Sequence, residues 1–164
     1  MLVRLADPKD AQGMLDVINP LIKRGDTTAH QTPFTVERVT NHYIQPENLL
    51  SCHVASEGET ILGFQALMWA NDPVNDPMPD GWAYIASFVS DNSAGKGIGH
   101  QLFEATKQLA RSVGAVAIDA TIRADNIPGL GYYSKIGFVD YDRLIAVELS
   151  DGRRIDRIRK KFVL

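Results

Sequence analysis

The glycine-rich stretch from Phe88 to Leu102 constrains the fold of this chain more than any other segment. An apolar run over residues 83–89 leads into it, three glycines then alternate with Lys96 and Ile98, and an amphipathic pattern follows. This order predicts a strand, a glycine loop and a helix, because glycines allow tight turns and a helix start has unpaired N–H groups at a positive dipole end. Such a loop is suited to hold an anion, and phosphate is the anion we expect.

The length and composition indicate a single folded domain over residues 1–164. A hydrophobic share of 45% and a charged share of 23% are ordinary for a globular protein with one core. The formal net charge of −3 gives no general attraction to nucleic acid or to anionic membranes. We therefore expect no nucleic-acid partner and a ligand that binds in a local pocket.

The cysteine count and the start of the chain bear on localisation. Cys52 is the only cysteine, so no internal disulfide can form and a reducing compartment is expected. The first residues lack the apolar core of a signal peptide, and no apolar run approaches the roughly 18 residues of a membrane span. We expect a cytoplasmic protein without a membrane partner, and the sequence leaves a homodimer open as its assembly.

Hydrophobic periodicity predicts a mixed α+β fold around one sheet. Helices are expected over residues 8–25, 35–45, 98–114 and 128–135, the first with a break or bend at Pro20. Strands are expected over residues 2–6, 49–57, 60–70, 83–89, 115–123, 138–148 and 154–163. The strand, helix and strand within residues 83–123 form a βαβ unit, whose two strands would lie parallel.

Turn and loop signals separate these elements. Gly58-Glu59 and residues 150–153 predict hairpin turns between antiparallel strands. Residues 71–81 contain three prolines and three aspartates, which predicts a long surface loop of the kind that often carries function. The loop 25–34, with the helix after it, is expected to form one wall of a pocket.

Two common phosphate-binding motifs fit the glycine stretch poorly. A Walker A loop requires glycine where Ser90 stands, and Ser or Thr where Gly97 follows Lys96. A dinucleotide fingerprint requires Gly-x-Gly-x-x-Gly directly after the strand, whereas the glycines here are spaced by two from Gly95 and lie beyond an intervening polar segment. The glycines also have a simpler interpretation, in which they only turn the chain into a helix.

Two stretches resemble motifs of the GCN5-related N-acetyltransferase (GNAT) superfamily. Residues 89–99 are similar to its acetyl-CoA loop, Arg/Gln-x-x-Gly-x-Gly/Ala, and Gly97 and Gly99 match the two glycines. The later family pattern Asn-x-x-Ala/Gly-x-x-x-Tyr-x-x-x-Gly-Phe is resembled by Asn126, Gly129, Tyr132, Tyr133, Gly137 and Phe138. The order of the elements agrees over nearly the whole chain. The resemblance implies a GNAT-like fold, with a mostly antiparallel mixed sheet of six to seven strands, a splayed parallel pair and about four helices.

The resemblance implies acetyl-CoA as a co-substrate and no metal. By analogy, its binding residues would be Phe88, Val89, Gly95, Lys96, Gly97, Ile98, Gly99, His100 and Asn126. Free backbone groups of Phe88 and Val89 would hold the pantetheine arm and polarise the thioester carbonyl. The family's Arg or Gln at the loop start corresponds to Ala94, so backbone N–H groups and Lys96 would hold the pyrophosphate without that side chain.

The family's chemistry assigns a role to Tyr133, which occupies the position of a general acid that protonates the leaving thiolate. Acetyl transfer to an amine also requires the amine to lose a proton. The sequence does not identify the general base, and its candidates are His30, Asp72, Asp76, Asp80, Tyr84 and Ser87. The remaining histidines are expected at the surface or in packing, and Cys52 is expected to be a small buried hydrophobe.

The acceptor is predicted from a more limited similarity. Asn19-Pro20 and residues 26–29 are similar to the phosphinothricin acetyltransferase-like branch, which acetylates small amino acids and analogues. The leading hypothesis is therefore an acetyl-CoA-dependent N-acetyltransferase that acts on a small-molecule primary amine. The alternatives are an acetyltransferase for protein N-termini or lysines, and an acyl-CoA-binding domain without catalysis.

Overall fold

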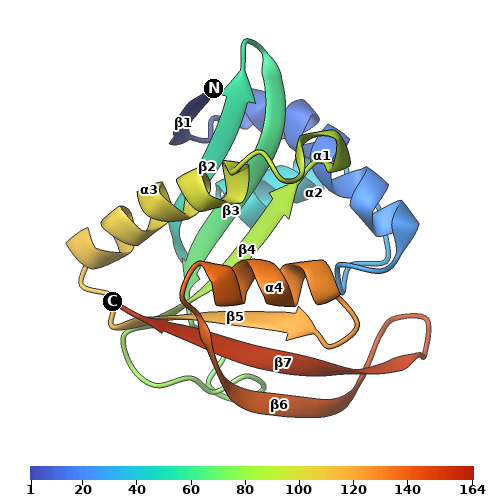
Figure 1. The fold of residues 1–164 in the computed structure, drawn as a ribbon, viewed down its shortest axis with the longest axis vertical. Coiled ribbons are helices and arrows are strands. Elements are labelled where there is room, and N and C mark those ends of the chain that lie inside the picture. The colour runs from blue at the N-terminus through green and yellow to red at the C-terminus, as the bar shows by residue number, and fades with distance from the viewer.

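One seven-stranded sheet is the centre of the computed structural model, which describes residues 1–164 (Figure 1). Its strands are β1 (Leu2–Leu5), β2 (Leu49–Glu57), β3 (Thr60–Trp69), β4 (Trp82–Val89), β5 (Ala117–Arg123), β6 (Val139–Glu148) and β7 (Arg154–Val163). They lie in the order β1-β2-β3-β4-β5-β7-β6, and only β4 and β5 run parallel. The predicted mixed sheet with one parallel pair is confirmed.

Four α-helices flank this sheet, together with three short helical turns. The helices are α1 (Ala11–Arg24), α2 (Val36–Val39), α3 (Ile98–Ser112) and α4 (Ile127–Lys135), and the turns are η1 (Pro8–Asp10), η2 (Thr40–Ile44) and η3 (Asp91–Ser93). Thr35 caps α2 by accepting a hydrogen bond from the N–H of Arg38, and the π-helical η2 continues it. The predicted helix over residues 35–45 is thus confirmed in extent, with a wider last turn.

The helix α1 is not broken at Pro20, contrary to one of the two expectations from the sequence. A proline inside a helix removes one backbone hydrogen bond to the carbonyl four residues earlier, here that of Asp16. Both Pro20 and Asp16 lie on the exposed side of α1, where water can satisfy that carbonyl. The buried residues of α1 on the opposite side hold the helix to the sheet.

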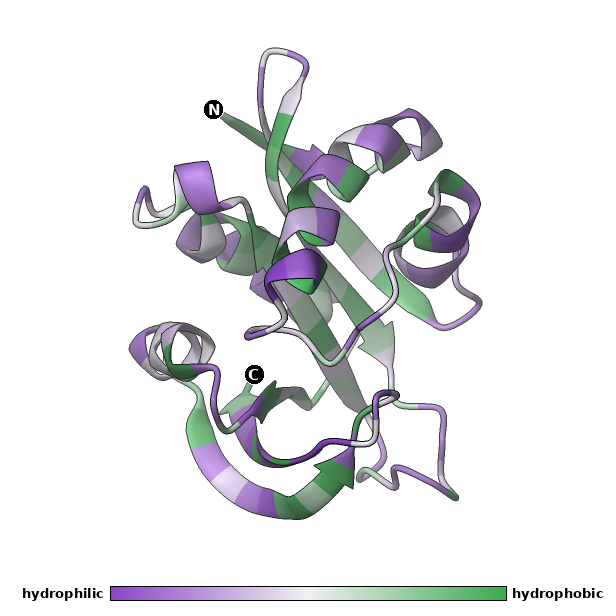
Figure 2. Cartoon of the chain, turned by 90° about the vertical axis from the view of Figure 1, so that its right-hand side faces the viewer, coloured by the Kyte–Doolittle hydropathy of each residue, from purple (hydrophilic) through white to green (hydrophobic).

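Apolar side chains divide into two main clusters on opposite faces of the sheet. On one face, Met14 and Ile18 of α1 pack with Phe64 of β3. On the other face, Phe103 of α3 packs with Ile118 of β5, next to residues of α4. Green segments accordingly gather on the central strands in Figure 2, and much of the helical surface is purple. We call these faces the α1 face and the α4 face.

The long loop between β3 and β4 is fixed to the sheet by a buried ionic network. Asp119 of β5 is 1% exposed and accepts hydrogen bonds from Tyr141 Oη and Arg159 Nε at 2.5 and 3.1 Å. Arg159 also donates to Asp76 of the loop at 2.7 Å. The predicted loop is therefore anchored at its middle. No helix of this structure has the length and apolar character needed to cross a membrane.

Candidate functional site

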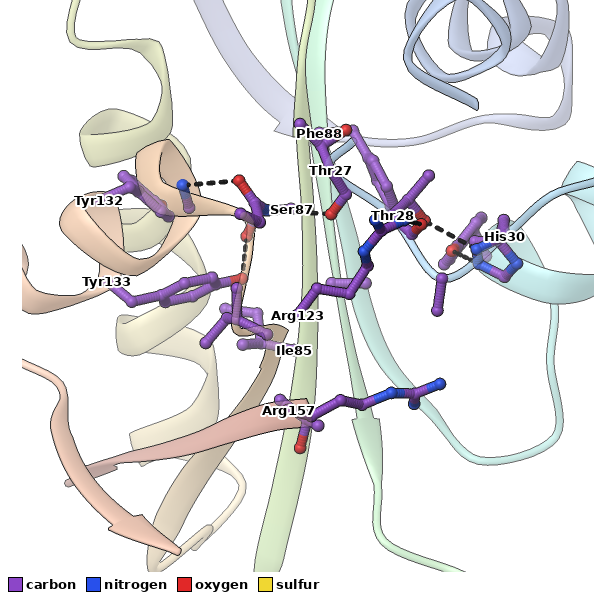
Figure 3. Close-up of a pocket in the computed structure, with 17 residues that line it drawn as sticks. Thr27, Thr28, His30, Ile85, Ser87, Phe88, Arg123, Tyr132, Tyr133 and Arg157 are labelled. Carbon is purple, nitrogen blue, oxygen red and sulfur yellow. Dashed lines mark hydrogen bonds between the residues drawn. The ribbon is translucent and has the colours of Figure 1, made fainter. Parts of the chain in front are cut away.

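The parallel strands β4 and β5 separate soon after they meet. Their pairing extends only from Trp82 and Ala117 to Tyr84 and Asp119, and beyond these residues the strands diverge. A cavity of about 230 Å³ lies at the resulting gap (Figure 3). It is lined by residues 27–30, 85–88 and 121–123, and by Tyr43, Asn126, Gly129, Tyr132, Tyr133 and Arg157. Side chains from both faces of the sheet therefore meet in one space.

Hydrogen bonds at the two ends of β4 reveal which of its backbone groups face this gap. The N–H of Ala70 donates to the carbonyl of Trp82 at 3.2 Å, and the N–H of Ser90 donates to the carbonyl of Leu62 at 2.9 Å. Because bonded and non-bonded residues alternate along an antiparallel pair, the even-numbered residues of β4 bond to β3. The odd-numbered residues then present their N–H and C=O groups on the opposite edge.

The free backbone groups at the gap therefore belong to Ile85, Ser87 and Val89, beyond the last pair with β5. The sequence analysis expects free backbone groups at Phe88 and Val89. The register agrees with this expectation for Val89, and the expectation is wrong for Phe88. The backbone of Phe88 bonds across β3 to Phe64, since these two residues are register partners at a bonded position. The Phe88 side chain lines the cavity on the α1 face.

The glycine loop forms the expected start of α3. Gly95 and Gly97 both have φ of +76°, a left-handed conformation that glycine adopts without strain. No N–H group from Gly95 to His100 donates a hydrogen bond within the chain. Six successive donors therefore surround the helix start, and the exposed Lys96 adds a positive charge. This donor set fits a pyrophosphate.

The loop lies directly against α4. The hydroxyl of Tyr132 donates to the carbonyl of Gly99 at 2.8 Å. A Cβ atom at Gly99 would lie 2.7 Å from the Tyr132 ring, so only glycine allows this close approach. The second glycine of the family's loop motif therefore brings α3 and α4 together.

A chain of hydrogen bonds connects this contact to Tyr133. Because the Gly99 carbonyl can only accept, the Tyr132 hydroxyl uses its single hydrogen there. The Gln65 amide then donates to Tyr132 at 3.2 Å and to Ser87 Oγ at 2.8 Å. Ser87 Oγ lies 2.9 Å from Tyr133 Oη, and its own hydrogen is free to be donated there. In this arrangement the Tyr133 hydrogen remains available to a group in the cavity.

Tyr133 remains protonated at neutral pH. Its side chain is 7% exposed, and burial raises the pKa of its phenol far above the ordinary value of 10.0. The hydroxyl lies at the cavity, beside Ser87 of β4 (Figure 3). A group in this state can donate a proton and cannot act as a base.

Two side chains hold the loop after α1 against the end of β5. Arg123 is 3% exposed and donates to the carbonyls of Gly25 and Thr28 at 3.0 and 2.9 Å, while Asp125 neutralises its charge. Asn126 donates to the carbonyl of Thr27 at 2.9 Å and caps α4 by accepting from the N–H of Gly129. The expected pocket wall from residues 25–34 is thus present.

Among the candidate bases, the structure places only His30 and Ser87 at the cavity. His30 Nε2 lies 2.8 Å from the hydroxyl of Tyr43. Burial and the nearby charges of His42, Arg38 and Arg157 lower the pKa of His30 from 6.5 to about 4. His30 is therefore neutral at pH 7 and a weak base.

The other candidate bases have different partners. Tyr84 accepts a hydrogen bond from Asn48 at 3.3 Å, Asp72 binds Asn75, and Asp76 pairs with Arg159. None of these candidates, nor Asp80, lines the cavity. Cys52 is 3% exposed and burial raises the pKa of its thiol to about 12, so the expected buried hydrophobe is confirmed.

Three cavity or network residues are difficult to find in the sequence. Gln65 is fully buried, and its only signal is that it interrupts an otherwise apolar strand. Tyr43 lies in a short helix with no distinctive motif. Arg157 lies among alternating charged residues of β7, which the sequence alone does not distinguish from a solvated strand face.

Comparison with known proteins gives consistent similarities. The acetyltransferase (GNAT) family pattern matches residues 20–138. YwnH of Bacillus subtilis (strain 168), which carries the provisional name phosphinothricin acetyltransferase, is 23% identical over 158 residues, or 95% of this chain and 94% of that protein.

Solved structures agree in fold over the whole chain. The ribosomal-protein-alanine N-acetyltransferase of Brucella melitensis has a TM-score of 0.82 at 20% identity, over 100% of both chains. The yncA structure from Salmonella typhimurium, which contains acetyl-CoA, has a TM-score of 0.78 at 19% identity, over 100% of this chain and 94% of that chain.

Proposed function

Because this chain belongs to the acetyltransferase (GNAT) family, we propose that it transfers the acetyl group of acetyl-CoA directly to a primary amine of a small molecule, an amino acid or an analogue. The family predicted from two short motifs is thereby confirmed, and the chain is an acetyltransferase. The observation that best supports the small-molecule proposal is the cavity at the gap between β4 and β5, with the Tyr133 hydroxyl and free backbone groups at its edge.

The chain's own groups fit acetyl-CoA in two places. The unpaired N–H groups from Gly95 to His100, with Lys96, would hold its pyrophosphate at the start of α3. The free backbone groups of Ser87 and Val89 would align its pantetheine arm along β4 and direct an N–H toward the thioester carbonyl. Bound acetyl-CoA supplies the activated acetyl group for the transfer.

Tyr133 would act as the general acid. The Gln65 amide donates to Ser87, and with Ser87 as the donor in its contact with Tyr133 the phenolic proton would be directed toward the leaving sulfur. Once this proton is given up, the Ser87 hydroxyl stabilises the phenolate that remains. A positioned acid of this kind contributes about 10²- to 10⁴-fold to a rate.

The acceptor amine would lose its proton before it attacks. No Asp or Glu lines the cavity, and His30 is too weak a base at a pKa of about 4 to hold a proton from an ammonium group. We therefore propose that the amine binds as the free base and that its proton passes to solvent. The acceptor would then reach the cavity from the α1 face, where His30 and Phe88 line it, because the glycine loop that suits acetyl-CoA lies against α4 on the opposite face.

A thiol-release assay with acetyl-CoA and a panel of amino acids, polyamines and short peptides tests the proposal. We expect thiol release with a small amine. Release only with peptides would support acetylation of a protein N-terminus or lysine, and CoA binding without release for any acceptor would support a non-catalytic binding domain. Calorimetry with CoA measures binding independently of turnover.

The acid role of Tyr133 has a direct test. In the Tyr133→Phe variant, we expect kcat to fall by about 100-fold or more while the Kd of CoA stays unchanged. Tyr84→Phe is a matched control, because Tyr84 lies on β4 but does not line the cavity. An unchanged kcat in Tyr133→Phe would contradict the assignment.

Three further expectations from the sequence stay predictions. The protein is proposed to be cytoplasmic and to act without a metal, and a homodimer is the assembly that the sequence leaves open. The structure contains no group of three or more His, Cys, Asp and Glu side chains that could hold a metal ion. Metal analysis of the purified protein and its sedimentation in solution would test the last two.

A further inference from the structure

The cavity has one positively charged side chain that forms no ion pair, and this residue is Arg157. No Asp or Glu is among the residues that line the cavity, and its only arginines are Arg123 and Arg157. Arg123 is neutralised by Asp125 through two hydrogen bonds of 2.9 and 2.7 Å. Arg157 takes part in no ion pair, and its Nε is buried without a hydrogen-bond partner.

This lack of a partner is unfavourable in the protein alone. Burial and the charge of Arg123 lower the pKa of Arg157 more than the negative charge of Asp76 raises it, whereas the arginines with carboxylate partners have raised pKa values. A buried guanidinium donor without an acceptor costs free energy, and a planar carboxylate satisfies two such donors at once. His30 adds no second positive charge at neutral pH.

The register of β7 places Arg157 on the side from which the acceptor would enter. Lys160 reaches Ser134 of α4, and Phe162 packs on Phe103 of α3, so the even-numbered residues of β7 face α4. Side chains alternate along a strand, and Arg157 therefore points to the α1 face. In Figure 3 its side chain extends from β7 to the side where His30 lies, whereas Tyr132 and Tyr133 lie on the other side.

We infer that Arg157 binds a carboxylate of the acceptor, so that the preferred acceptors carry an acidic group as well as the amine. This inference rests on the proposed function and adds the group that selects the substrate. The phosphates of acetyl-CoA are a different anion, and the glycine loop that suits them lies on the α4 face, against Tyr132. Amines with several positive charges are disfavoured, because the cavity offers them no carboxylate.

The first test compares acceptors that differ only in the acidic group. Glycine, alanine and leucine are measured against glycinamide, alaninamide and leucinamide, and against spermidine, with kcat/KM corrected for the fraction of free amine at each pH. We expect the acids to exceed the amides by tenfold or more. Equal values for acids and amides, or preference for spermidine, would overturn the inference while leaving the acetyltransferase proposal intact.

The second test changes the arginine. In Arg157→Gln, we expect KM for the amino acids to rise by about 10- to 100-fold, with no change for the amides or in the Kd of CoA, and Arg157→Lys should recover part of the loss. Arg154→Gln is the matched control on β7, since that side chain is 67% exposed. An equal rise in KM for acids and amides would show that Arg157 does not bind the carboxylate.

A binding measurement decides the inference without turnover. The CoA-loaded protein is titrated with N-acetylalanine and with its primary amide, and binding is followed by NMR. We expect tighter binding of the carboxylate, and loss of this difference in Arg157→Gln. Equal binding of both compounds would reject the inference. Absence of turnover with every amine, together with carboxylate-selective binding, would instead count against the proposed function alone.

Discussion

At the scale of single residues, the direction of hydrogen bonds determines which groups can act. The Gly99 carbonyl fixes the direction of donation from Tyr132, and the Gln65 amide donates to both Tyr132 and Ser87 Oγ. Tyr133 is at the end of this chain with its proton unassigned. Tyr133, the proposed acid, is thus connected through Ser87, Gln65 and Tyr132 to the glycine loop.

Removal of the Ser87 hydroxyl should separate positioning from binding. In Ser87→Ala, Tyr133 loses its hydrogen-bond partner, and we expect kcat to fall about tenfold, which corresponds to roughly 1.4 kcal/mol. KM and the Kd of CoA should change little. Ser51→Ala is the matched control, because the Ser51 hydroxyl is buried on β2 without any partner. A loss of kcat in both variants would indicate a structural effect.

His30 should make stability depend on pH. Its pKa is about 4 in the folded protein and 6.5 ordinarily, so between these values the unfolded chain binds a proton that the folded one does not. Stability therefore falls as pH decreases from about 6.5 to about 4. We expect an effect of about 1 kcal/mol, smaller than the full shift implies, because part of the ring is exposed.

Urea unfolding at pH 7 and at pH 4.5 measures this dependence. His30→Gln should lose less stability between the two pH values than the original protein. An identical pH dependence in His30→Gln and the original protein would contradict the prediction.

The sequence identifies site residues where a motif fixes both type and spacing. Asn126, Tyr133 and the glycines from 95 to 99 belong to such patterns, because caps, turns and close contacts require these residue types. The role of Arg157 cannot be found in this way. Its position at the cavity depends on pairing between β5 and β7 and on the gap between β4 and β5, which are long-range features of the sheet.

At the scale of elements, the glycine loop combines two different uses of glycine. Gly95 and Gly97 adopt positive φ with open space around them, whereas Gly99 allows contact with Tyr132. Local sequence predicts such a loop well because the constraint lies within a few residues. It predicts less well the π-helical turn η2 and the continuity of α1 through Pro20, because solvent exposure and tertiary packing determine both.

Gly97→Ala should test the loop as a binding element. Alanine at a φ of +76° costs about 1 kcal/mol of stability and disturbs the direction of the neighbouring N–H groups, so we expect the Kd of CoA to rise about tenfold. Gly152→Ala is the matched control, since Gly152 also has a positive φ of +86° and open space around it but lies in the hairpin between β6 and β7. Calorimetry on both variants distinguishes strain from lost binding.

At the scale of the whole molecule, buried charge holds distant segments together. Asp119 joins β5, β6 and β7, and through Arg159 it joins the loop before β4. The sequence placed Asp119 inside a strand but gave no sign of its partners, because they lie 22 and 40 residues away along the chain. The overall α+β fold was predictable from periodicity and turn signals, whereas this network was not.

Asp119→Asn should therefore destabilise the protein strongly. The change leaves the buried Arg159 with only Asp76, and we expect a loss of about 3–5 kcal/mol in the free energy of unfolding, measured in urea. Glu148→Gln is the control, because its ion pair with Arg154 is exposed at 3.7 Å and should contribute less than about 1 kcal/mol. A small loss in Asp119→Asn would show that the network is not needed for stability.

The short parallel pairing of β4 and β5 has a mechanical consequence. Within the sheet, only three ladder pairs join the block of β1 to β4 to the block of β5, β7 and β6, so few hydrogen bonds between strands oppose the separation of β4 from β5. A molecule bound in the gap contacts both blocks, so its binding free energy stabilises the arrangement in which they are joined. The acyl donor would thus bridge the gap in the sheet while it serves as reactant. After the product leaves, only the short pairing between β4 and β5 would join the two blocks within the sheet.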